Sequence, residues 1–519
     1  MAPSPLSVQL TAPNGVTYEQ PLGLFINNEF VAAQSGETID AVNPFNESVI
    51  ARVHAAGAKD VDTAVQAARE AFNGPWGEVT CTERGRLLSR LADIVEAQAE
   101  TLATVEAWDG GKPFHVALQE DVQEVIAVFR YYAGYADKLH GQGNGTEKNQ
   151  HVFTTREPIG VCGQIIPWNY PLSMAAWKLG PAIATGNCVV IKAAEQTPLS
   201  ILYLATLFKE AGYPKGVVNV INGYGRDAGA ALASHMGVDK IAFTGSTQAG
   251  REIMKLASGN LKSITLETGG KSPLVVFDDA DLDKAAYWGH VGIMSNAGQV
   301  CTANSRIFVH EKVYDDFLRR FLEKAASAKV GDPFAADTFQ GPQVGQAQRD
   351  RILQYIEVGK SEGGTLALGG KVHETAGNGR GYFVEPTVFT NVKDDMTIYR
   401  EEIFGPVAAV LSFKTEEEVV KRANDTFFGL GAALFTKDVS RVHRISRKIQ
   451  SGSKSSLPVP VSDELPTNVA LLGVWVNSSN NSDIRAPFGG YKQSGVGREC
   501  GQAGIEAYTN IKTVYITLD

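Results

Sequence analysis

Short apolar segments alternate with helix-forming segments from residue 159 onward, and this alternation limits the possible folds of the chain. Four apolar segments have the length and composition of buried strands: residues 161–166, 188–192, 217–221 and 240–244. Strands that alternate with helices form βαβ units and a parallel sheet, so the expected fold class is α/β. Ligands bind such sheets beyond the carboxyl ends of the strands. We therefore expect one shared crevice near the residues that follow these strands: Asn169, Lys192, Gly223 and Gly245.

A second region of the same kind begins after Gly270, so we place a domain boundary near Gly269 and Gly270. Its expected strands and helices are residues 272–277, 306–309, 313–328, 347–362 and 408–411. Nearer the N-terminus, the pattern predicts a hairpin and three amphipathic helices: residues 24–31, 61–72, 83–107 and 122–140. The alternating stretch at residues 507–518 predicts an edge strand that pairs with another subunit.

Length, charge and cysteine content exclude several classes of protein. A chain of 519 residues exceeds one hydrophobic core, so two or three domains are expected. A net charge of −9 argues against nucleic acid or an anionic membrane as the main partner. No apolar run approaches about 18 residues, so we expect no transmembrane helix. Five scattered cysteines and the lack of a secretory signal predict a reduced, cytoplasmic protein.

Cys301 stands in a loop of small and polar residues, NAGQVCTA at 296–303. The thiolate is the nucleophilic form of cysteine, so catalysis would need an activating group and a donor for an oxyanion. A lone cysteine is more often a small buried hydrophobe. Its role therefore depends on groups from other segments.

Two other segments supply candidates for those groups. Glu267 lies in an apolar segment next to two glycines, where desolvation would raise its pKa and make it a base near neutral pH. A solvated or ion-paired glutamate is the commoner alternative. Asn169 lies between Pro167 and Pro171, and its amide is suited to an oxyanion; the alternative is an asparagine that completes a turn.

Glycine-rich turns indicate a site for an anion. Residues 243–250 follow a strand and open a helix, so their N–H groups could bind a pyrophosphate. Residues 223–229 only approach the dinucleotide fingerprint, and residues 265–272 lack the first glycine of a P-loop. None of the nine histidines lies beside these motifs, and no HExxH or CxxC cluster is present. We therefore expect no metal site and disfavour Cys–His proteases and Ser–His–Asp hydrolases.

From residue 24 to residue 518 the chain resembles the NAD(P)-dependent aldehyde dehydrogenase superfamily, most nearly the tetrameric, acetaldehyde-type enzymes of fungi. Seven motifs in the family's order carry the resemblance: PWNYP at 167–171, KLGPA at 178–182, FTGS at 243–246, LETGGK at 266–271, GQVC at 298–301, EEIFGP at 401–406 and PFGG at 487–490. The resemblance implies a Rossmann-type cofactor domain with a parallel sheet, an α/β catalytic domain and a small β oligomerisation arm.

The resemblance also implies NAD-dependent oxidation of a small aldehyde to an acid, through a thiohemiacetal and a thioester on Cys301. Glu267 would be the general base, Asn169 and the Cys301 N–H the oxyanion hole, and Lys178 a support for the thioester step. The implied cofactor site comprises Ile165, Ile166, Pro167, Trp168, Lys192, Glu195, Gly225, Gly229, Phe243, Gly245, Ser246, Glu402 and Phe404. Glu195 favours NAD over NADP, because a carboxylate binds a 2′-hydroxyl and repels a 2′-phosphate. Tyr170, Trp177 and Phe488 would line the substrate tunnel.

The implied domains are an NAD-binding domain at 1–140 and 159–269 and a catalytic domain at 270–498. Segments 141–158 and 499–519 would join subunits into a homotetramer.

One segment, residues 453–473, has no counterpart in the family pattern. The genetic code allows a splice donor at residues 453–455 and an acceptor at residues 472–473, so we hypothesise that residues 454–473 are a retained intron. The alternative is a genuine surface loop, because long insertions can be tolerated thermodynamically. Two other functions stay open: a cysteine-dependent esterase or thioesterase, and an inactive binding protein of the same fold.

Overall fold

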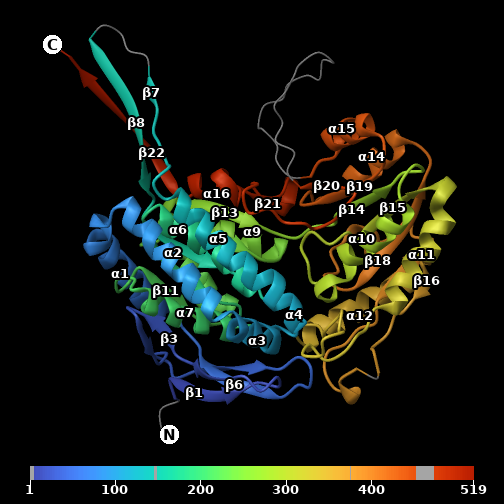
Figure 1. Ribbon diagram of the computed structural model, residues 1–519, viewed down its shortest axis with the longest axis horizontal. Helices are drawn as coiled ribbons and strands as arrows, with labels where there is room; N and C mark the ends of the chain where they lie inside the picture. Colours follow the sequence, from blue (N-terminus) through green and yellow to red (C-terminus); the bar gives the residue numbers. More distant parts are fainter. Residues whose placement is uncertain (1–4, 145–148, 375, 452–472, 519) are drawn as a thin grey trace.

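The computed structural model describes residues 5–144, 149–374, 376–451 and 473–518, and two sheets lie side by side in it (Figure 1). The first sheet contains five parallel strands in the order β13 (Ser263–Glu267), β12 (Lys240–Thr244), β9 (Val161–Ile165), β10 (Cys188–Lys192) and β11 (Val218–Ile221). Nearly all residues of these strands are buried, as in a sheet covered by helices on both faces. The α/β fold that the alternation predicts is confirmed.

The edges of the first sheet are antiparallel. The predicted hairpin is confirmed as β3 (Leu24–Ile26) and β4 (Glu29–Val31), which extend the sheet beyond β11. Asn27 and Asn28 both have positive φ, at 54° and 62°, as a tight hairpin turn requires. At the other edge β21 (Gly495–Val496) pairs with β13, so the chain returns to the first sheet close to its C-terminal end.

Helices on this sheet differ from the predicted ones at their ends. The single helix expected at residues 83–107 is wrong: Gln98, with φ −103° and ψ 15°, separates α2 (Cys81–Ala97) from α3 (Ala99–Gly110). The helix expected at residues 122–140 ends earlier, as α5 (Val122–Tyr135), and it continues a π-helical turn, η2 (Ala117–Asp121). The remaining helices of this part are α1 (Ala58–Asn73), α4 (Phe114–Val116), α6 (Pro171–Ala184), α7 (Leu199–Ala211), α8 (Ala230–Ser234) and α9 (Thr247–Ala257).

The second sheet has seven strands, all parallel except β16. Their order is β16 (Thr365–Leu368), β17 (Thr387–Thr390), β18 (Val407–Phe413), β15 (Arg306–His310), β14 (Pro273–Val276), β19 (Ala432–Phe435) and β20 (Val474–Val476). Two apolar clusters pack around it. Its helices are α10 (Leu282–Met294), α11 (Tyr314–Ser327), α12 (Gln346–Ser361), α13 (Thr397–Arg400), α14 (Glu416–Asn424) and α15 (Val439–Lys448).

A separate three-stranded arm projects away from both sheets (Figure 1). The predicted final strand is confirmed as β22 (Thr509–Thr517), and it lies at the edge of the arm. Its partner is β8 (Gln150–Pro158) of the same chain, which also pairs with β7 (Gly143–Asn144). The elements not yet bounded are β1 (Ser7–Thr11), β2 (Thr17–Pro21), β5 (Thr38–Val42), β6 (Val49–His54) and α16 (Gly501–Glu506).

Within the described ranges, no helix combines the length and the apolar character needed to span a membrane. The same residues contain no group of three or more His, Cys, Asp or Glu side chains that could hold a metal ion. The segment singled out in the sequence, residues 453–473, lies outside the described residues except for Gly473, which precedes β20.

Candidate active site

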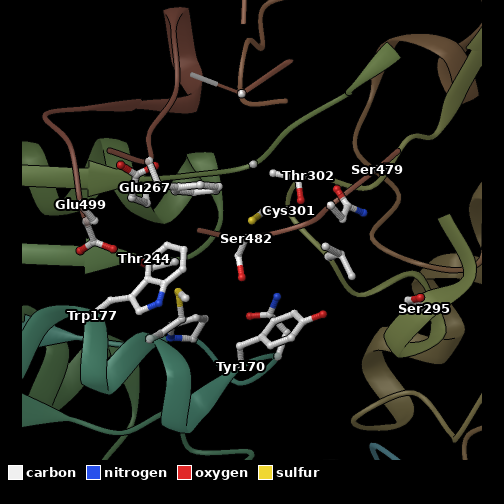
Figure 2. Close-up of a pocket in the computed structure, with 18 of the residues that line it drawn as sticks. Tyr170, Trp177, Thr244, Glu267, Ser295, Cys301, Thr302, Ser479, Ser482 and Glu499 are labelled. Atoms are coloured by element: carbon white, nitrogen blue, oxygen red, sulfur yellow. The ribbon is translucent and has the colours of Figure 1, made fainter. Parts of the chain in front are cut away.

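One cavity of about 990 Å³ lies where strands of both sheets end, and Cys301 lines it (Figure 2). Residues predicted for the site that line this cavity are Pro167, Trp168, Asn169, Tyr170, Trp177, Gly245, Ser246, Glu267, Cys301, Glu402, Phe404 and Phe488. Residues predicted for the site that do not line it are Ile165, Ile166, Lys178, Lys192, Glu195, Gly225, Gly229 and Phe243. The expected crevice therefore includes Asn169 and Gly245 but not Lys192 or Gly223.

The loop before Cys301 has an unusual backbone. It follows the short turn η5 (Ser295–Gly298), in which Asn296, Ala297 and Gly298 have φ of 48°, 56° and 72°. A Cβ on Gly298 would come within 2.1 Å of the Gly405 carbonyl, so only glycine fits there. This close approach joins the cysteine loop to the segment that carries Glu402 and Phe404.

Asn169 holds the same loop from the first sheet. Its Nδ2 donates to the Gln299 carbonyl at 2.9 Å, and Nδ2 of Asn296 donates to the Asn169 carbonyl at 3.0 Å. An amide NH₂ has two hydrogens, so one bond to Gln299 leaves a second donor on the cavity wall beside Cys301. The asparagine is therefore both a loop support and a candidate oxyanion donor.

The electrostatics of the cavity keep the Cys301 thiol protonated. Burial raises the pKa of Cys301 to about 12, and the carboxyls of Glu402 and Glu267 act in the same direction. Thiolate formation in this cavity therefore requires a proton acceptor or added positive charge.

Glu267 ends β13 and is 3% exposed. Neither of its carboxyl oxygens has a hydrogen-bond partner among the described residues. Burial raises its pKa well above the ordinary value, and the nearby Glu499 raises it further. The expected desolvation of Glu267 is thus present, and the alternative of a solvated or ion-paired glutamate does not hold here.

Behind Glu267 lies a buried ion pair that the sequence did not indicate. Lys178, fully buried in α6, lies 2.7 Å from the carboxylate of Glu499 and donates to Thr244 Oγ1 at 2.6 Å. Thr244 and Glu499 line the cavity, so Lys178 reaches the site only through them. Figure 2 shows Glu267 and Glu499 on the same side of the Cys301 sulfur. No spacing in the sequence links residue 499 to β13; only the pairing of β21 with β13 does so.

Glu402 and Phe404 form another part of the cavity wall. Glu402 accepts a hydrogen bond from the Gly270 N–H at 2.9 Å, and burial raises its pKa to about 7. A Cβ on Gly269 would lie 2.1 Å from the Glu402 carboxylate, so a side chain there would displace that carboxylate. Phe404 has a φ of 60° and packs edge-on against Trp168, with ring centroids 5.3 Å apart.

Two side chains of α12, absent from the predicted set, hold this segment. Gln348 donates to the Phe404 carbonyl at 2.8 Å, and Arg351 donates to the Glu402 carbonyl at 3.2 Å. Both residues line the cavity. Their helical spacing was visible in the sequence, but nothing in that spacing indicated which strand end they face.

The turn at Gly245 and Ser246 meets the requirements of an anion site. Ser246 caps α9 by accepting a hydrogen bond from the Ala249 N–H at 3.2 Å. A Cβ on Gly245 would approach the Phe243 ring within 2.5 Å, so a larger residue would displace that ring. The N-terminus of α9 therefore faces the cavity, and Gly245 has no side chain to cover the backbone there. Such a site suits a phosphate group.

Lys192, Glu195 and Gly229 form a neighbouring group beyond the cavity lining. Lys192 Nζ lies 3.3 Å from the Glu195 carboxylate, and the Lys192 side chain would contact a Cβ on Gly229 at 3.6 Å. Gly225 has no atom within 4 Å of the position of a Cβ. Near the end of β10, an ammonium and a carboxylate lie close to glycine backbone. This combination suits the hydroxyls of a ribose.

Aromatic rings form the remaining end of the cavity. Trp177 and Phe488 pack edge-on with centroids 5.1 Å apart, and Tyr170 lies beside them in the lining. The sequence prediction missed the carboxylates Glu120, Asp121 and Glu124, which line the same cavity. Their spacing along one helix was visible in the sequence, but the π-helical turn that directs them toward the cavity was not.

Known proteins match nearly the whole chain. The model of the "Aldehyde dehydrogenase family" matches residues 30–456 and 463–514. An aldehyde dehydrogenase of Emericella nidulans is 54% identical over 504 residues, covering 97% of this chain and 96% of its own. One from Aspergillus niger is 54% identical over 516 residues, covering 99% of each chain.

Solved structures match the same extent of the chain. The structure of an aldehyde dehydrogenase of Bacillus cereus in complex with NAD⁺ is 46% identical, with a TM-score of 0.90. It covers 96% of this chain and 97% of its own. The aldehyde dehydrogenase fold expected from the seven motifs is confirmed, and the chain belongs to the aldehyde dehydrogenase family.

Proposed function

We propose that this protein oxidises an aldehyde to a carboxylic acid with NAD, through a covalent intermediate on Cys301. One observation carries the proposal: a nucleophile, an amide donor and a buried, unpaired carboxyl line one cavity. These are Cys301, Asn169 and Glu267. The same cavity continues to the anion-binding turn at Gly245 and Ser246.

The residues present fit NAD. Gly245 and Ser246 would hold the pyrophosphate, Lys192 and Glu195 the adenosine ribose, and Glu402 and Phe404 the nicotinamide end. When bound, NAD⁺ supplies the two-electron oxidant for the aldehyde carbon. The Glu195 carboxylate would repel a 2′-phosphate, which favours NAD over NADP.

The first step is addition of the Cys301 sulfur to the aldehyde carbon. Glu267, in its carboxylate form, is the group of this chain placed to take the thiol proton. The carbonyl oxygen becomes an alkoxide, and Asn169 Nδ2 with the Cys301 N–H would hold it. Oxidation of this adduct leaves an acyl group on the sulfur as a thioester.

The second step is hydrolysis of the thioester. Glu267 first releases the thiol proton to solvent, and its carboxylate then takes a proton from a water molecule, whose oxygen attacks the acyl carbon. The carbon–sulfur bond breaks, the acid leaves and the sulfur recovers a proton. Lys178 would support this step through Thr244 and Glu499, which it contacts directly.

The finer assignments belong to the same proposal. The first sheet with its helices, residues 1–140 and 159–269, would bind NAD, and residues 270–498 would carry the nucleophile. The arm would form a homotetramer, because the outer edge of β22 has no strand partner among the described residues of this chain and exposes Ile511, Tyr515 and Ile516. We propose a cytoplasmic location from the few, unpaired cysteines.

Replacing the nucleophile tests the proposal. In Cys301→Ala, acetaldehyde and NAD should yield no NADH absorbance, while NAD binding measured by calorimetry should persist. Cys81→Ala, on the partly exposed start of α2, is the matched control. Turnover by Cys301→Ala would reassign the nucleophile. Hydrolysis of an acyl ester by the unmodified enzyme, with no NADH formed from acetaldehyde and NAD, would favour an esterase.

A further inference from the structure

Three carboxylates, Glu120, Asp121 and Glu124, line the aromatic end of the cavity, and together they are called the wall below. Glu120 and Asp121 end the π-helical turn η2, and Glu124 follows about one turn later in α5. A π turn contains one residue more than an α-helical turn, so it changes the direction in which the following side chains point. Here all three carboxylates line the same cavity as Cys301.

Tyr170 lies within electrostatic reach of both this wall and the Cys301 thiol. Its pKa is raised first by burial and then by Asp121, Glu120 and Cys301, so these groups lie within electrostatic reach of one side chain. The Lys112 ammonium lies 3.6 Å from the centre of the Tyr170 ring. A substrate bound between Cys301 and Tyr170 would therefore lie within electrostatic reach of these carboxylates.

The charge of the wall is only partly neutralised. Lys112 forms an ion pair with Asp121, and both side chains are buried. Glu124 accepts a hydrogen bond from Ser482 Oγ at 3.0 Å, whereas Glu120 is exposed. Lys112 reaches both Glu120 and Glu124 electrostatically, and His115 reaches Glu120.

Cationic side chains are scarce around the cavity itself. Of the lining residues in the described parts of the chain, Arg351 is the single Lys or Arg, and its guanidinium donates to the Glu402 carbonyl. Arg351 therefore belongs to the end of the cavity formed by Glu402 and Phe404. At the aromatic end three carboxyls lie near one ammonium, Lys112, and burial raises the pKa of each carboxyl.

Trp177 offers a hydrogen-bond donor to an occupant of this end. It is 6% exposed and lines the cavity, yet its indole N–H has no hydrogen-bond partner among the described residues. A hydrocarbon chain alone would leave that donor unsatisfied. Aromatic faces beside carboxylates are the combination that binds organic ammonium groups and the water around them.

We propose that the aromatic end selects aldehydes bearing an alkylammonium group over aldehydes bearing a carboxylate, and that Glu124 is the main determinant. The inference rests on the proposed aldehyde oxidation and adds a substrate class to it. An alkylammonium group would add a second cation near Glu124, which Lys112 reaches only electrostatically, and would lie against the rings of Tyr170 and Trp177. A carboxylate substrate would meet three carboxylates there against the single ammonium of Lys112, which already pairs with Asp121.

A matched pair of aldehydes tests the proposal. Trimethylammonioacetaldehyde and its neutral isostere 3,3-dimethylbutanal have the same shape, and 4-oxobutanoate serves as the anionic probe. NADH formation gives kcat/KM for each. We expect the cation to exceed its isostere by about tenfold, the effect of one carboxylate acting across several ångströms of partly hydrated cavity, and the anion to be the poorest.

Three variants assign the effect. Glu124→Gln should lower the cation-to-isostere ratio of kcat/KM by about tenfold, since it removes one charge at constant shape. Glu120→Gln should lower the ratio by a smaller factor. Because Glu120 is exposed, this variant should fold even if Glu124→Gln does not. Glu96→Gln, exposed on α2 and paired with Arg130, makes the same change of net charge away from the cavity and should leave the ratio unaltered.

A ratio at or below one in the unmodified enzyme would overturn the proposal. So would a ratio that both cavity variants leave unchanged, or one that Glu96→Gln lowers equally. NADH formation from 3,3-dimethylbutanal with no preference for the cation would reject this inference and retain the proposed function. No NADH from any aldehyde would reject both.

Discussion

Glu267 and Cys301 owe their electrostatic properties to burial, and this is a property of single residues. Neither carboxyl oxygen of Glu267 has a partner in the described chain, and its pKa is raised well above the ordinary value. The apolar residues and glycines around Glu267 in the sequence are sufficient to predict its desolvation. They contain no sign of Glu499, which raises the pKa further from a distant part of the chain.

The raised pKa of Glu267 fixes the direction of the pH dependence. The proposed base is the carboxylate, so thioester hydrolysis should be slow at low pH and should accelerate as pH rises through the raised pKa. Replacing Glu499 by Gln removes a like charge, lowers the pKa of Glu267 and should move the rising limb of kcat to lower pH. The measurement is kcat from about pH 5 to about pH 10, because the pH at which kcat rises reports the pKa of the essential base. An unmoved or upward-shifted limb would contradict this role of Glu499.

Glu195 sets the choice of cofactor by its charge. Its carboxylate is 31% exposed and pairs with Lys192 at 3.3 Å. In Glu195→Gln the repulsion of a 2′-phosphate is lost, and the NADP-to-NAD ratio of kcat/KM should rise by about tenfold. Glu70→Gln, exposed on α1, is the charge-matched control. A ratio unchanged by Glu195→Gln would remove Glu195 from the cofactor site.

At the scale of elements, strand–helix alternation predicted the parallel strands well and the helix boundaries less well. Apolar spacing continues across Gln98, so the break between α2 and α3 has no counterpart in the pattern. The π turn η2 also escapes a search for helical spacing, because one extra residue alters direction without altering composition. The missed carboxylates of the cavity follow from that second omission.

The element most open to test is β20 and the segment before it. Ser451 Oγ donates to the Gly473 carbonyl at 3.0 Å, and the Ala432 N–H donates to the same carbonyl at 2.7 Å. The two ends of the segment therefore meet beside β19. Deleting residues 454–473 joins Ser453 to Val474 and should leave the sheet intact.

We expect the deletion variant to melt at the same or a higher temperature than the full chain, because closing a shorter loop costs about 1 kcal/mol less. Activity should be equal or greater, since the deletion removes one described lining residue, Gly473, and keeps β20 and the lining residues from 474 to 488. Thermal unfolding and NADH formation measure both. A variant that does not fold would show that the segment is structural, and peptides from it in native enzyme would reject the intron hypothesis.

At the scale of the whole molecule, the site is built where two sheets meet. Asn169 and Gly245 follow strands of the first sheet, Cys301 precedes β15 of the second, and Phe488 comes from the chain as it returns to β21. The alternation of strands and helices made the positions of Asn169 and Gly245 predictable. The return of the chain was not predictable from local pattern, because β21 is two residues long and pairs antiparallel at an edge.

The central claim is that oxidation passes through an acyl group on Cys301 that Glu267 helps to hydrolyse. Intact-mass and peptide mass spectrometry of Glu267→Gln, mixed with NAD and acetaldehyde, tests it most directly. Glu267→Gln should also slow the addition step, in which Glu267 takes the thiol proton, but it should slow hydrolysis more. We therefore predict a slowed burst of NADH of about one equivalent per active site, followed by still slower turnover, and an acetyl adduct on the peptide that contains Cys301. A burst-free reaction at the rate of the unmodified enzyme, with no adduct on Cys301, would contradict the account.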